Sequence, residues 1–412
     1  MPQRFSPAPG SSPGDRDKTV CEFFAGIGLV QEGLRGSGWQ CLYAGDIDPK
    51  KQAMYEGHYG PSPHYHLGDV WDAAEVVERI ARPPFLATAS FPCTDMSLAG
   101  KRQGLAGSES SALFGFLRIV ETLGPRAPRV ILLENVPGFL TARQGRDFAA
   151  AIEALAGLGY WIDSFVIDAR WFVPQSRPRL FVAGYHAGLD RPPLVRRPDA
   201  TQDWGSAWQR AVDRAAKIRP SRLRAVMERL QPSTGWTTVD AGSPEQQTYD
   251  LADFLDLDAT QDWWTDAESD RHLEMTSDSH RRRVELLRGR QEPLLVTGFR
   301  RVRQGRQRLE VRFDGIAGCL RTPRGGSAKQ LVLAVGRNKV RMRWMTPREY
   351  ARLQGADDFR LPANTLQGLF GFGDAVCVPA IRWIDRHMLT PVYESWRAAA
   401  AGGVEDPACP IP

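Results

Sequence analysis

A short glycine-containing turn near the start of the chain is the first place where the backbone could serve a ligand. It reads Phe24-Ala25-Gly26-Ile27-Gly28 and lies between an apolar run and a segment with helical character. Glycines let the chain turn tightly and approach a ligand closely, and the N-terminus of the following helix attracts an anionic group. Taken alone, this spacing is explained equally well by an ordinary connection between a strand and a helix.

Three acids follow the turn. Asp46-Ile47-Asp48 ends the next apolar run, about 20 residues beyond the turn, where an acid can accept hydrogen bonds from both ribose hydroxyls of a nucleoside cofactor. Asp46 and Asp48 are both candidates for this role. Asp69, in Leu67-Gly68-Asp69-Val70, can accept from an adenine amino group. The turn and the acids together predict a nucleoside-containing cofactor.

The cysteines indicate a reducing compartment. There are 6 of them, without a Cys-x-x-Cys pair, and the 7 histidines do not cluster with them at metal-binding spacing. We therefore expect neither structural zinc, nor any other metal site, nor a disulfide framework. By default each thiol is a small buried hydrophobe. Cys93, in Ser90-Phe91-Pro92-Cys93-Thr94-Asp95-Met96-Ser97, needs support from its neighbours before it can be given a chemical role.

Short apolar runs alternate with helical segments from Lys18 to about His186. The expected strands are Thr19–Phe24, Gln40–Asp46, Phe85–Ser90, Arg129–Glu134, Ile162–Asp168 and Leu180–Tyr185. The expected helices are Val30–Ser37, Ala73–Ala81, Ala112–Leu123 and Arg146–Leu158. This alternation predicts an α/β fold with a doubly wound, mostly parallel, Rossmann-like sheet, whose ligands gather beyond the carboxyl ends of the strands.

The rhythm breaks after His186 and returns near the C-terminus. We expect a disordered tail over 1–17, a cofactor-binding domain over 18–186 and a second, smaller irregular domain over 187–341. The chain then returns to the first domain over 342–395 and ends in a disordered tail over 396–412. No apolar run approaches the roughly 20 residues that a membrane span needs, and the N-terminus lacks the apolar centre of a secretory signal.

Positive charge is concentrated in one part of the chain. Residues 281–348 hold 19 Lys and Arg against 4 Asp and Glu, although the net charge of the whole chain is only +5. A basic segment on an otherwise acidic protein usually meets a polyanion. A solvated arginine-rich surface is the alternative.

Five motifs, in this order along the chain, resemble the C5-cytosine-specific DNA methyltransferase family of bacterial or phage type. They are Pro92-Cys93, Glu134-Asn135-Val136, Gln175-Ser176-Arg177-Pro178-Arg179, the run from Met345-Thr346-Pro347-Arg348-Glu349 through Arg352-Leu353-Gln354-Gly355, and Gly373-Asp374-Ala375-Val376. The resemblance covers about residues 18–186 and 343–390. Residues 187–341 match only by position, as the family's target-recognition domain.

The resemblance implies transfer of a methyl group from S-adenosylmethionine to carbon 5 of a cytosine flipped out of DNA. Cys93 would add to carbon 6, because a cysteine is strongly nucleophilic even at a small thiolate fraction. Glu134 would hold N3 and the exocyclic amine of the base. Arg179 would orient Glu134 and the base O2 through its planar fork. Arg177 is a second catalytic candidate, although a structural ion pair at the sheet edge explains it equally well.

The same resemblance assigns further residues to the cofactor and to DNA. Cofactor contacts are expected from Phe24, Gly26, Ile27, Gly28, Asp46, Ile47, Asp69, Val70, Pro92, Leu113, Asp374, Ala375 and Val376. DNA contacts are expected from Ser97, Lys101, Arg102, Arg301, Arg321, Arg324, Lys329 and Gln330. Lys101 and Arg102 belong to a Gly-rich loop that resembles a lid over the flipped nucleotide, with an ordinary surface loop as the alternative. Arg, Lys and Gln are the side chains that pair with guanine and adenine edges, but phosphate contact is equally open to each.

Several positions depart from the family pattern, among them Thr94 and Asp95 after the cysteine and Ser110 in the approximate place of a frequent arginine. Leu29 stands where a second glycine is common, and Asp374 stands where the family usually has asparagine. An added carboxylate there could favour the sulfonium of the cofactor or could simply face water. None of these departures removes a group that the chemistry requires.

Three other functions fit the sequence less well. A tRNA cytosine methyltransferase of the same fold would have a smaller recognition region. A regulatory relative without activity would not need Cys93, Glu134 and Arg179, and a dinucleotide-dependent oxidoreductase would not carry Pro92-Cys93 with Glu134-Asn135-Val136. We therefore expect double-stranded DNA as the partner, a cognate restriction endonuclease as an optional second one, and a cytoplasmic, nucleoid-associated monomer.

Overall fold

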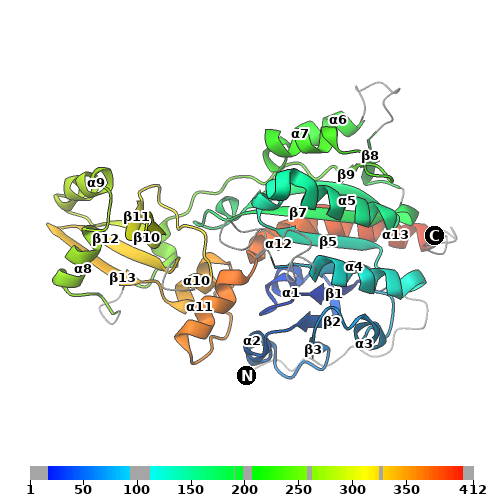
Figure 1. Ribbon diagram of the computed structural model, residues 1–412, viewed down its shortest axis with the longest axis horizontal. Coiled ribbons are helices and arrows are strands. Elements are labelled where there is room, and N and C mark those ends of the chain that lie inside the picture. Colours follow the sequence, from blue (N-terminus) through cyan, green and yellow to red (C-terminus); the bar gives the residue numbers. More distant parts are fainter. Residues whose placement is uncertain are drawn as a thin grey trace.

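The computed structural model describes residues 17–92, 112–189, 191–197, 207–257, 262–323 and 328–401 (Figure 1). Its largest element is a seven-stranded sheet with the order β3-β2-β1-β4-β5-β7-β6. The strands are β1 (Thr19–Phe23), β2 (Gln40–Asp46), β3 (Tyr65–Leu67), β4 (Leu86–Ala89), β5 (Val130–Asn135), β6 (Tyr160–Asp168) and β7 (Pro178–His186). All pairs are parallel except those of β7, which runs antiparallel to both β5 and β6. The predicted mostly parallel α/β sheet is confirmed.

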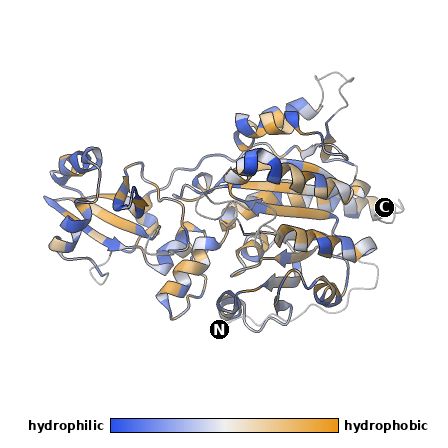
Figure 2. Cartoon of the chain, viewed as in Figure 1, coloured by the Kyte–Doolittle hydropathy of each residue, from blue (hydrophilic) through white to orange (hydrophobic). Residues whose placement is uncertain are grey.

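Helices cover both faces of this sheet, so that its strands are almost uniformly apolar (Figure 2). Successive residues of a strand point to opposite faces, and β5 therefore contributes Val130 and Leu132 to one hydrophobic core and Ile131 and Leu133 to the other. The first core is closed by α1 (Leu29–Leu34), α12 (Val378–Ile384) and α13 (Thr390–Ala401). The second core is closed by α3 (Ala73–Arg79), α4 (Ala112–Leu123) and α5 (Arg146–Gly157).

Two elements of this sheet region were not expected from the sequence. The short strand β3 forms the edge of the sheet, and α2 (Pro49–Tyr59) connects it to β2. The side chain of Asp48 caps α2 by accepting a hydrogen bond from the Lys50 backbone N–H, and Pro49 occupies the first helical turn. An acidic cap followed by proline is a helix-start signal, and it could have predicted α2.

Residues 191–197 and 207–257 pack against the large sheet, which differs from the expected domain boundary. They form α6 (Ala207–Arg214), α7 (Ser221–Arg229) and the two-stranded sheet of β8 (Leu194–Arg196) and β9 (Thr237–Val239). Trp208 and Trp236 belong to the second core. The Arg219 guanidinium donates to both carboxylate oxygens of Asp163 on β6, at 2.8 Å each, and both side chains are fully buried. The separate domain therefore begins after this region.

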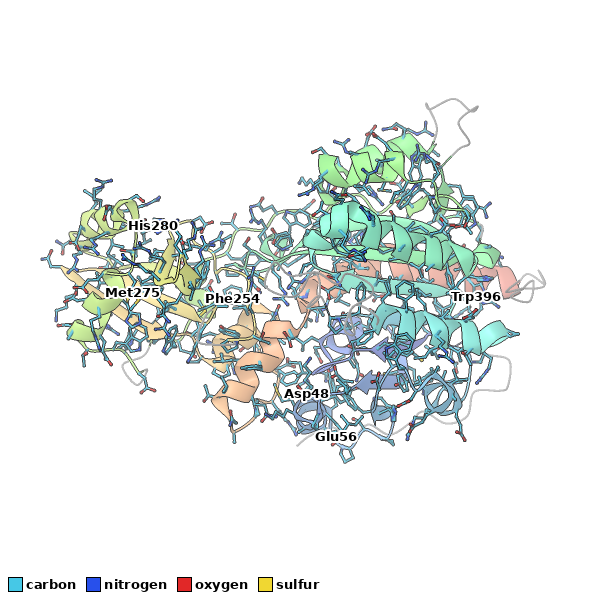
Figure 3. The ribbon with its side chains drawn as sticks, in the orientation of Figure 1. Asp48, Glu56, Phe254, Met275, His280 and Trp396 are labelled. Carbon is cyan, nitrogen blue, oxygen red and sulfur yellow. The ribbon has the colours of Figure 1, made fainter. Side chains whose placement is uncertain are left out.

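The separate domain is a four-stranded antiparallel sheet with the order β11-β10-β12-β13. Its elements are α8 (Asp266–Leu273), α9 (Asp278–Arg288), β10 (Leu294–Arg303), β11 (Arg306–Arg312), β12 (Gln330–Gly336) and β13 (Lys339–Trp344). Leu273 of α8 and Val284 of α9 close a core of its own. Met275 and His280 mark the helical side of this domain, far from Trp396 (Figure 3). We call residues 262–344 the small domain.

Two helices connect the small domain to the large sheet: α10 (Pro347–Leu353) and α11 (Thr365–Asp374). Arg343 of β13 forms a buried ion pair with Glu349 of α10, with Nη1 2.8 Å from Oε2. Beyond them, α13 continues to Ala401, and Trp396 packs into the first core. The expected disordered tail over 396–412 therefore begins too early in the chain. No helix among the described residues is both long and apolar enough to cross a membrane.

Candidate active site

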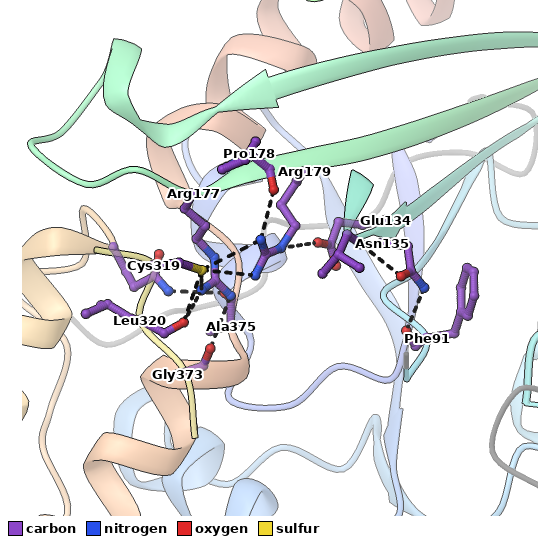
Figure 4. A network of polar contacts seen from close by, with 12 residues as sticks. Phe91, Glu134, Asn135, Arg177, Pro178, Arg179, Cys319, Leu320, Gly373 and Ala375 are labelled. Atoms are coloured by element: carbon purple, nitrogen blue, oxygen red, sulfur yellow. Dashed lines mark hydrogen bonds and ion pairs between the residues drawn. The ribbon is translucent and has the colours of Figure 1, made fainter. Parts of the chain in front are cut away.

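Glu134 and Arg179 form an ion pair at the carboxyl edge of the parallel strands (Figure 4). Arg179 Nε lies 2.9 Å from Glu134 Oε1, and the two side chains are only 15% and 12% exposed. Glu134 lies near the carboxyl end of β5, whereas Arg179 lies near the start of β7. Because β7 runs antiparallel to β5, its first residues return to the edge where β5 ends. The topology thus brings together two motifs that are distant in the sequence.

Asn135 holds the chain that leads to the predicted nucleophile. Its Nδ2 donates to the Phe91 carbonyl oxygen at 3.2 Å, and its Oδ1 accepts from the Val136 backbone N–H at 2.8 Å. The side chain of Asn135 is 5% exposed. The described chain reaches Pro92, one residue before Cys93, which itself lies outside the described residues. Asn135 therefore positions the segment that precedes Cys93. From the sequence alone it was only the middle residue of the Glu134-Asn135-Val136 motif and had no role of its own.

Arg177 donates its hydrogen bonds to main-chain carbonyls from two other parts of the chain. Its Nη1 donates to Leu320 O at 2.6 Å, and its Nη2 donates to Gly373 O at 3.2 Å and to Ala375 O. Burial, followed by the nearby charge of Arg179, lowers the pKa of Arg177. These surroundings argue against the expected catalytic role of Arg177. They also argue against the alternative, a structural ion pair at the sheet edge, because the partners are main-chain carbonyls. Its guanidinium joins β7 to the small domain and to the end of α11.

The thiol of Cys319 lies beside both arginines. Its Sγ is 3.5 Å from Arg177 Nη1 and 3.9 Å from Arg179 Nη1 and Nη2. Burial raises the pKa of Cys319, but the charges of Arg177, Arg179 and Arg321 outweigh it, so the pKa lies below its ordinary value. A thiol of this kind is more readily ionised than an ordinary buried cysteine. Cys319 was not predicted, because its partners come from distant motifs.

Two buried glutamines complete the polar framework behind the ion pair. Gln175 Nε2 donates to Leu353 O at 2.6 Å, and Gln175 Oε1 accepts from the Leu320 backbone N–H at 3.2 Å. Gln354 Nε2 donates to Phe372 O at 2.7 Å and to Ala375 O at 3.1 Å. Both glutamine side chains are fully buried. This explains why glutamines occur in the third and fourth motifs: they join β7, α10, α11 and the small domain.

The glycine-containing turn has the backbone that its sequence predicts. Gly26 and Gly28 have φ of 58° and 83°, and Phe24 also has a positive φ of 55°. A Cβ on Gly28 would lie 2.6 Å from a ring carbon of Tyr55, whereas a Cβ on Gly26 would meet its first neighbour, Lys51 Cδ, only at 3.9 Å. Gly28 is therefore needed for packing, and Gly26 leaves one side of the turn open.

The acids after β2 shape this turn. Asp46 Oδ2 accepts from the Gly26 backbone N–H at 2.9 Å, and Asp46 Oδ1 accepts from the Asp48 backbone N–H at 2.9 Å. Between them Ile47 is 68% exposed, which is unusual for a large apolar side chain. Asp69 is exposed after β3, and its Oδ1 accepts a local hydrogen bond from the Trp71 backbone N–H. A carboxylate has about four lone-pair sites, so Asp46, Asp48 and Asp69 all retain the capacity to accept from a ligand.

These residues fit a nucleoside group. An exposed apolar side chain between two carboxylates offers one surface for a flat base and acceptors for hydroxyl groups, and the open side of Gly26 leaves room for close approach. Other expected cofactor residues are placed differently: Ile27, Leu113 and Val376 are buried in the cores. Val70 and Ala375 are half-buried, and Pro92 is exposed.

The β10–β11 hairpin carries much of the positive charge of the small domain. Arg301 pairs across the ladder with Arg308, and Arg303 pairs with Arg306, so all four side chains emerge on one face. Glu310 is close to two of them, with its Oε1 2.9 Å from Arg301 Nε and 3.3 Å from Arg303 Nε. Like charges directly opposite one another destabilise a sheet, so this arrangement favours a surface that meets an anion.

A second group of cations surrounds Trp344. Arg300 lies 4.6 Å and the Lys329 Nζ 4.9 Å from the centre of its ring. Burial and the charge of Arg300 lower the pKa of Lys329. Gln330, by contrast, is 2% exposed and its Nε2 donates to Ala328 O at 3.3 Å. Gln330 therefore belongs to the interior of the sheet, which contradicts the expected contact with a base edge, because alternate strand residues point inward. Arg321 is exposed.

Ser97, Lys101, Arg102 and Arg324 lie outside the described residues, as Cys93 does. Within the described part of the chain, no three His, Cys, Asp or Glu side chains gather where they could hold a metal ion.

The site thus combines a glutamate–arginine pair, a turn suited to a nucleoside and a basic separate domain, on a doubly wound sheet. Residues 18–390 match the profile of the C-5 cytosine-specific DNA methylase family, and the chain belongs to this family. The chain is 34% identical over 172 residues to the type II methyltransferase M.BsuFI of Bacillus subtilis, and the match covers 42% of this chain and 40% of that protein. It is 25% identical over 394 residues to the type II methyltransferase M1.ScrFI of Lactococcus lactis subsp. cremoris, covering 94% and 83%.

The first match spans less than half of the relative's length, and the same holds for the type II methyltransferase M.HpaII of Haemophilus parainfluenzae, of which 49% is covered at 31% identity. Among solved structures, the Schizosaccharomyces pombe Dnmt2 methyltransferase has a TM-score of 0.54 at 14% identity, covering 92% of this chain and 99% of that one. The Entamoeba histolytica methyltransferase EhMeth has a TM-score of 0.57 at 13% identity, covering 93% and 99%. At this identity the likeness shows the fold alone.

Proposed function

We propose that this chain methylates carbon 5 of cytosine in double-stranded DNA and uses S-adenosylmethionine as the methyl donor. The observation that carries this proposal is the Glu134–Arg179 ion pair, held at the carboxyl edge of the sheet beside the segment that leads to Cys93. The relatives named above are type II methyltransferases, and we extend that role, with a cognate endonuclease as its counterpart, to this chain.

The residues of the site divide the chemistry between them. The Cys93 thiolate forms a bond to carbon 6 of a flipped-out cytosine, and the electron pair of the ring double bond moves toward carbon 5. Glu134 holds N3 and the exocyclic amine, and so stabilises the charge that develops in the ring. Arg179, already bonded to Glu134 through Nε, presents its remaining N–H groups toward O2 of the base. After carbon 5 has gained the methyl group, it loses its proton to a base, and the bond to Cys93 breaks.

S-adenosylmethionine, when bound, supplies an electrophilic methyl group on a sulfonium. Asp46 and Asp48 would accept from the ribose hydroxyls, Ile47 would contact the adenine ring, and Asp69 would accept from the adenine amino group. The support is the exposure of Ile47 and Asp69, together with the open side of Gly26.

A trapping experiment tests the nucleophile. A duplex carrying 5-fluorocytosine at the target position should form a stable covalent adduct in the presence of S-adenosylmethionine, because fluorine cannot leave as a cation. The adduct should be identified by peptide mass spectrometry. Cys319 is the rival to be excluded, since its thiol lies 3.9 Å from Arg179 Nη1 and has a lowered pKa.

We expect the adduct to map to Cys93, to be absent in Cys93→Ser and to form in Cys319→Ala. Cys93→Ser should still bind the duplex. An adduct on Cys319, or one that forms without Cys93, would overturn the proposed mechanism. A transfer RNA of matched length serves as the competing substrate: preferential methylation of that RNA would replace DNA as the proposed substrate.

We further propose that the small domain reads the target sequence. Its two groups of cations, on the β10–β11 hairpin and around Trp344, support this assignment. Residues 191–197 and 207–257 pack on the large sheet and should not contribute. Grafting residues 262–344 from a relative of different specificity should therefore transfer the methylated site, as bisulfite sequencing would report. A matched graft of residues 191–257 alone should leave the site unchanged, and a change produced by this second graft would contradict the assignment.

A further inference from the structure

Residues 316–321 of the small domain lie against the motif that carries Arg179, and we call them the connecting segment. The Ala317 backbone N–H donates to Pro174 O at 2.7 Å, and Ala317 O accepts from the Ser176 backbone N–H at 2.9 Å. These two bonds form a parallel β-bridge, and Ala317 is fully buried. The connecting segment is therefore hydrogen-bonded directly to the start of the strand on which Arg179 lies.

The same segment is held by two strands of the small-domain sheet. Thr297 Oγ1 on β10 donates to Ile316 O at 3.0 Å, and Gln330 Nε2 on β12 donates to Cys319 O at 3.5 Å. Gly318 leaves room for the second contact, because a Cβ there would lie only 3.0 Å from Gln330 Oε1. Since packed interiors transmit strain, a shift of the small-domain sheet would move the connecting segment with it.

An amide at position 330 is unfavourable for folding alone. Gln330 is 2% exposed, and its Oε1 is buried with no hydrogen-bond partner among the residues that the structure describes. A buried acceptor without a partner costs free energy, whereas an unbranched apolar side chain of similar size would avoid that cost. The hydrogen bond from Gln330 to Cys319 O therefore indicates a role beyond folding.

The Cys319 side chain ends at the proposed catalytic arginine (Figure 4). Its Sγ lies 3.9 Å from both Nη1 and Nη2 of Arg179 and 3.5 Å from Nη1 of Arg177. Glu134 Oε1 contacts Arg179 on its other side, 2.9 Å from Nε. The two guanidiniums carry like charges, and the sulfur, a weak acceptor, lies near both. Cys319 thus contacts the Nη end of the Arg179 guanidinium, and Glu134 contacts the Nε end.

We propose that Cys319 is a positioning residue, which Gln330 holds in place from the small domain and which orients Arg179 toward the flipped-out cytosine. This inference rests on the proposed function. The position of the small domain on its target is thereby transmitted to the Nη groups that donate to O2 of the base. A displaced group of this kind lowers the rate, because its contact matters most in the transition state. The connecting segment should therefore affect methyl transfer and leave DNA affinity unchanged.

The test measures single-turnover methyl transfer in the full chain, with saturating S-adenosylmethionine and plasmid DNA in which bisulfite sequencing has located a target site. Cys319→Ala removes the sulfur, and Gln330→Met removes the donor to Cys319 O with little change in volume. Each should lower the rate roughly 10-fold and change the affinity for the plasmid by less than about twofold. Cys319→Ser, which restores an acceptor, should recover part of the rate.

Two comparisons separate positioning from stability. In an Arg179→Met background, Cys319→Ala and Gln330→Met should have no further effect, because both act through the group that is already lost. Thr276→Val is the matched control, since it removes another buried hydrogen bond of the small domain, from Thr276 Oγ1 to Leu273 O at 2.6 Å, outside the connecting segment. Thr276→Val should leave the rate unchanged.

Four results would overturn the inference. An unaltered rate in Cys319→Ala would show that the sulfur does not position Arg179. An equal loss of rate in Gln330→Met with and without Arg179 would show that Gln330 acts elsewhere. A loss of plasmid affinity in proportion to the rate would assign both residues to DNA binding, and a matching loss of rate in Thr276→Val would assign the effect to stability. Failure of the unaltered chain to methylate any plasmid DNA would instead overturn the proposed function and this inference with it.

Discussion

Arg177 and Arg179 are separated by one residue and have the same charge, yet their surroundings predict opposite effects of substitution. Arg177 is 2% exposed and donates to the carbonyls of Leu320, Gly373 and Ala375. Arg179 is 15% exposed and pairs with Glu134. We expect Arg177→Met to lower stability and Arg179→Met to lower the rate of methyl transfer, because the first residue joins segments and the second faces the base.

The magnitude for Arg177 follows from the groups that it would leave behind. Ala375 O still accepts from Gln354 Nε2 at 3.1 Å and Leu320 O from the weaker Cys319 thiol donor at 3.4 Å, so Gly373 O is fully affected and Leu320 O in part. A buried acceptor that loses its partner costs about 1–3 kcal/mol. Removing a buried cation, whose pKa is lowered by burial, returns part of this. The free energy of unfolding should therefore fall by about 2–4 kcal/mol.

Both variants should be studied by urea unfolding and by methyl-transfer kinetics under saturating cofactor. Arg177→Met should unfold at lower urea concentration, while the folded fraction keeps most of its turnover. The folded fraction of Arg179→Met should lose about 10²-fold or more in turnover, the usual contribution of a preorganised donor. An Arg177→Met variant of unaltered stability with lost turnover would refute this reasoning and restore Arg177 as a catalytic residue.

Three further predictions concern other parts of the molecule. Glu134→Gln keeps the shape of the side chain and removes the acid, so turnover should fall about 10²–10⁴-fold while calorimetric affinity for the cofactor stays nearly constant; unaltered turnover would place the acid elsewhere. Burial raises the pKa of Glu22 to about 8, so its contribution to stability is fully present below the unfolded pKa of about 4.3 and is lost as the pH rises through about 8. Glu22→Gln should therefore be more stable than the unaltered chain at about pH 9 and similar at about pH 4. If urea unfolding gave the same stability difference between the two chains at both pH values, the result would contradict this. Lys329→Met should reduce the slope of log K against log salt by about 0.9 and weaken all duplexes alike; a change limited to one sequence would assign Lys329 to base reading.

The sequence by itself determined the family, the type of sheet and most of its elements. The expected strand Gln40–Asp46 and the expected helix Ala112–Leu123 coincide with β2 and α4. These features are local, because the apolar runs of a sheet buried on both faces and the turns at strand ends are written in contiguous residues. The motifs around Cys93, Glu134 and Arg179 are contiguous as well, which is why their types could be recognised before their positions were known.

The tertiary structure decided which of these residues meet. The reversal of β7 brings Arg179 to Glu134, and no local pattern marks a strand as antiparallel. The burial of Gln330 and the ion pair of Lys51 with Asp374 depend on contacts between segments far apart in the chain. The same is true of the fully buried pair of Asp163 with Arg219, which attaches residues 207–257 to the large sheet. A charged side chain reads as a surface residue in the sequence, and only its partner, supplied by the fold, allows it to be buried.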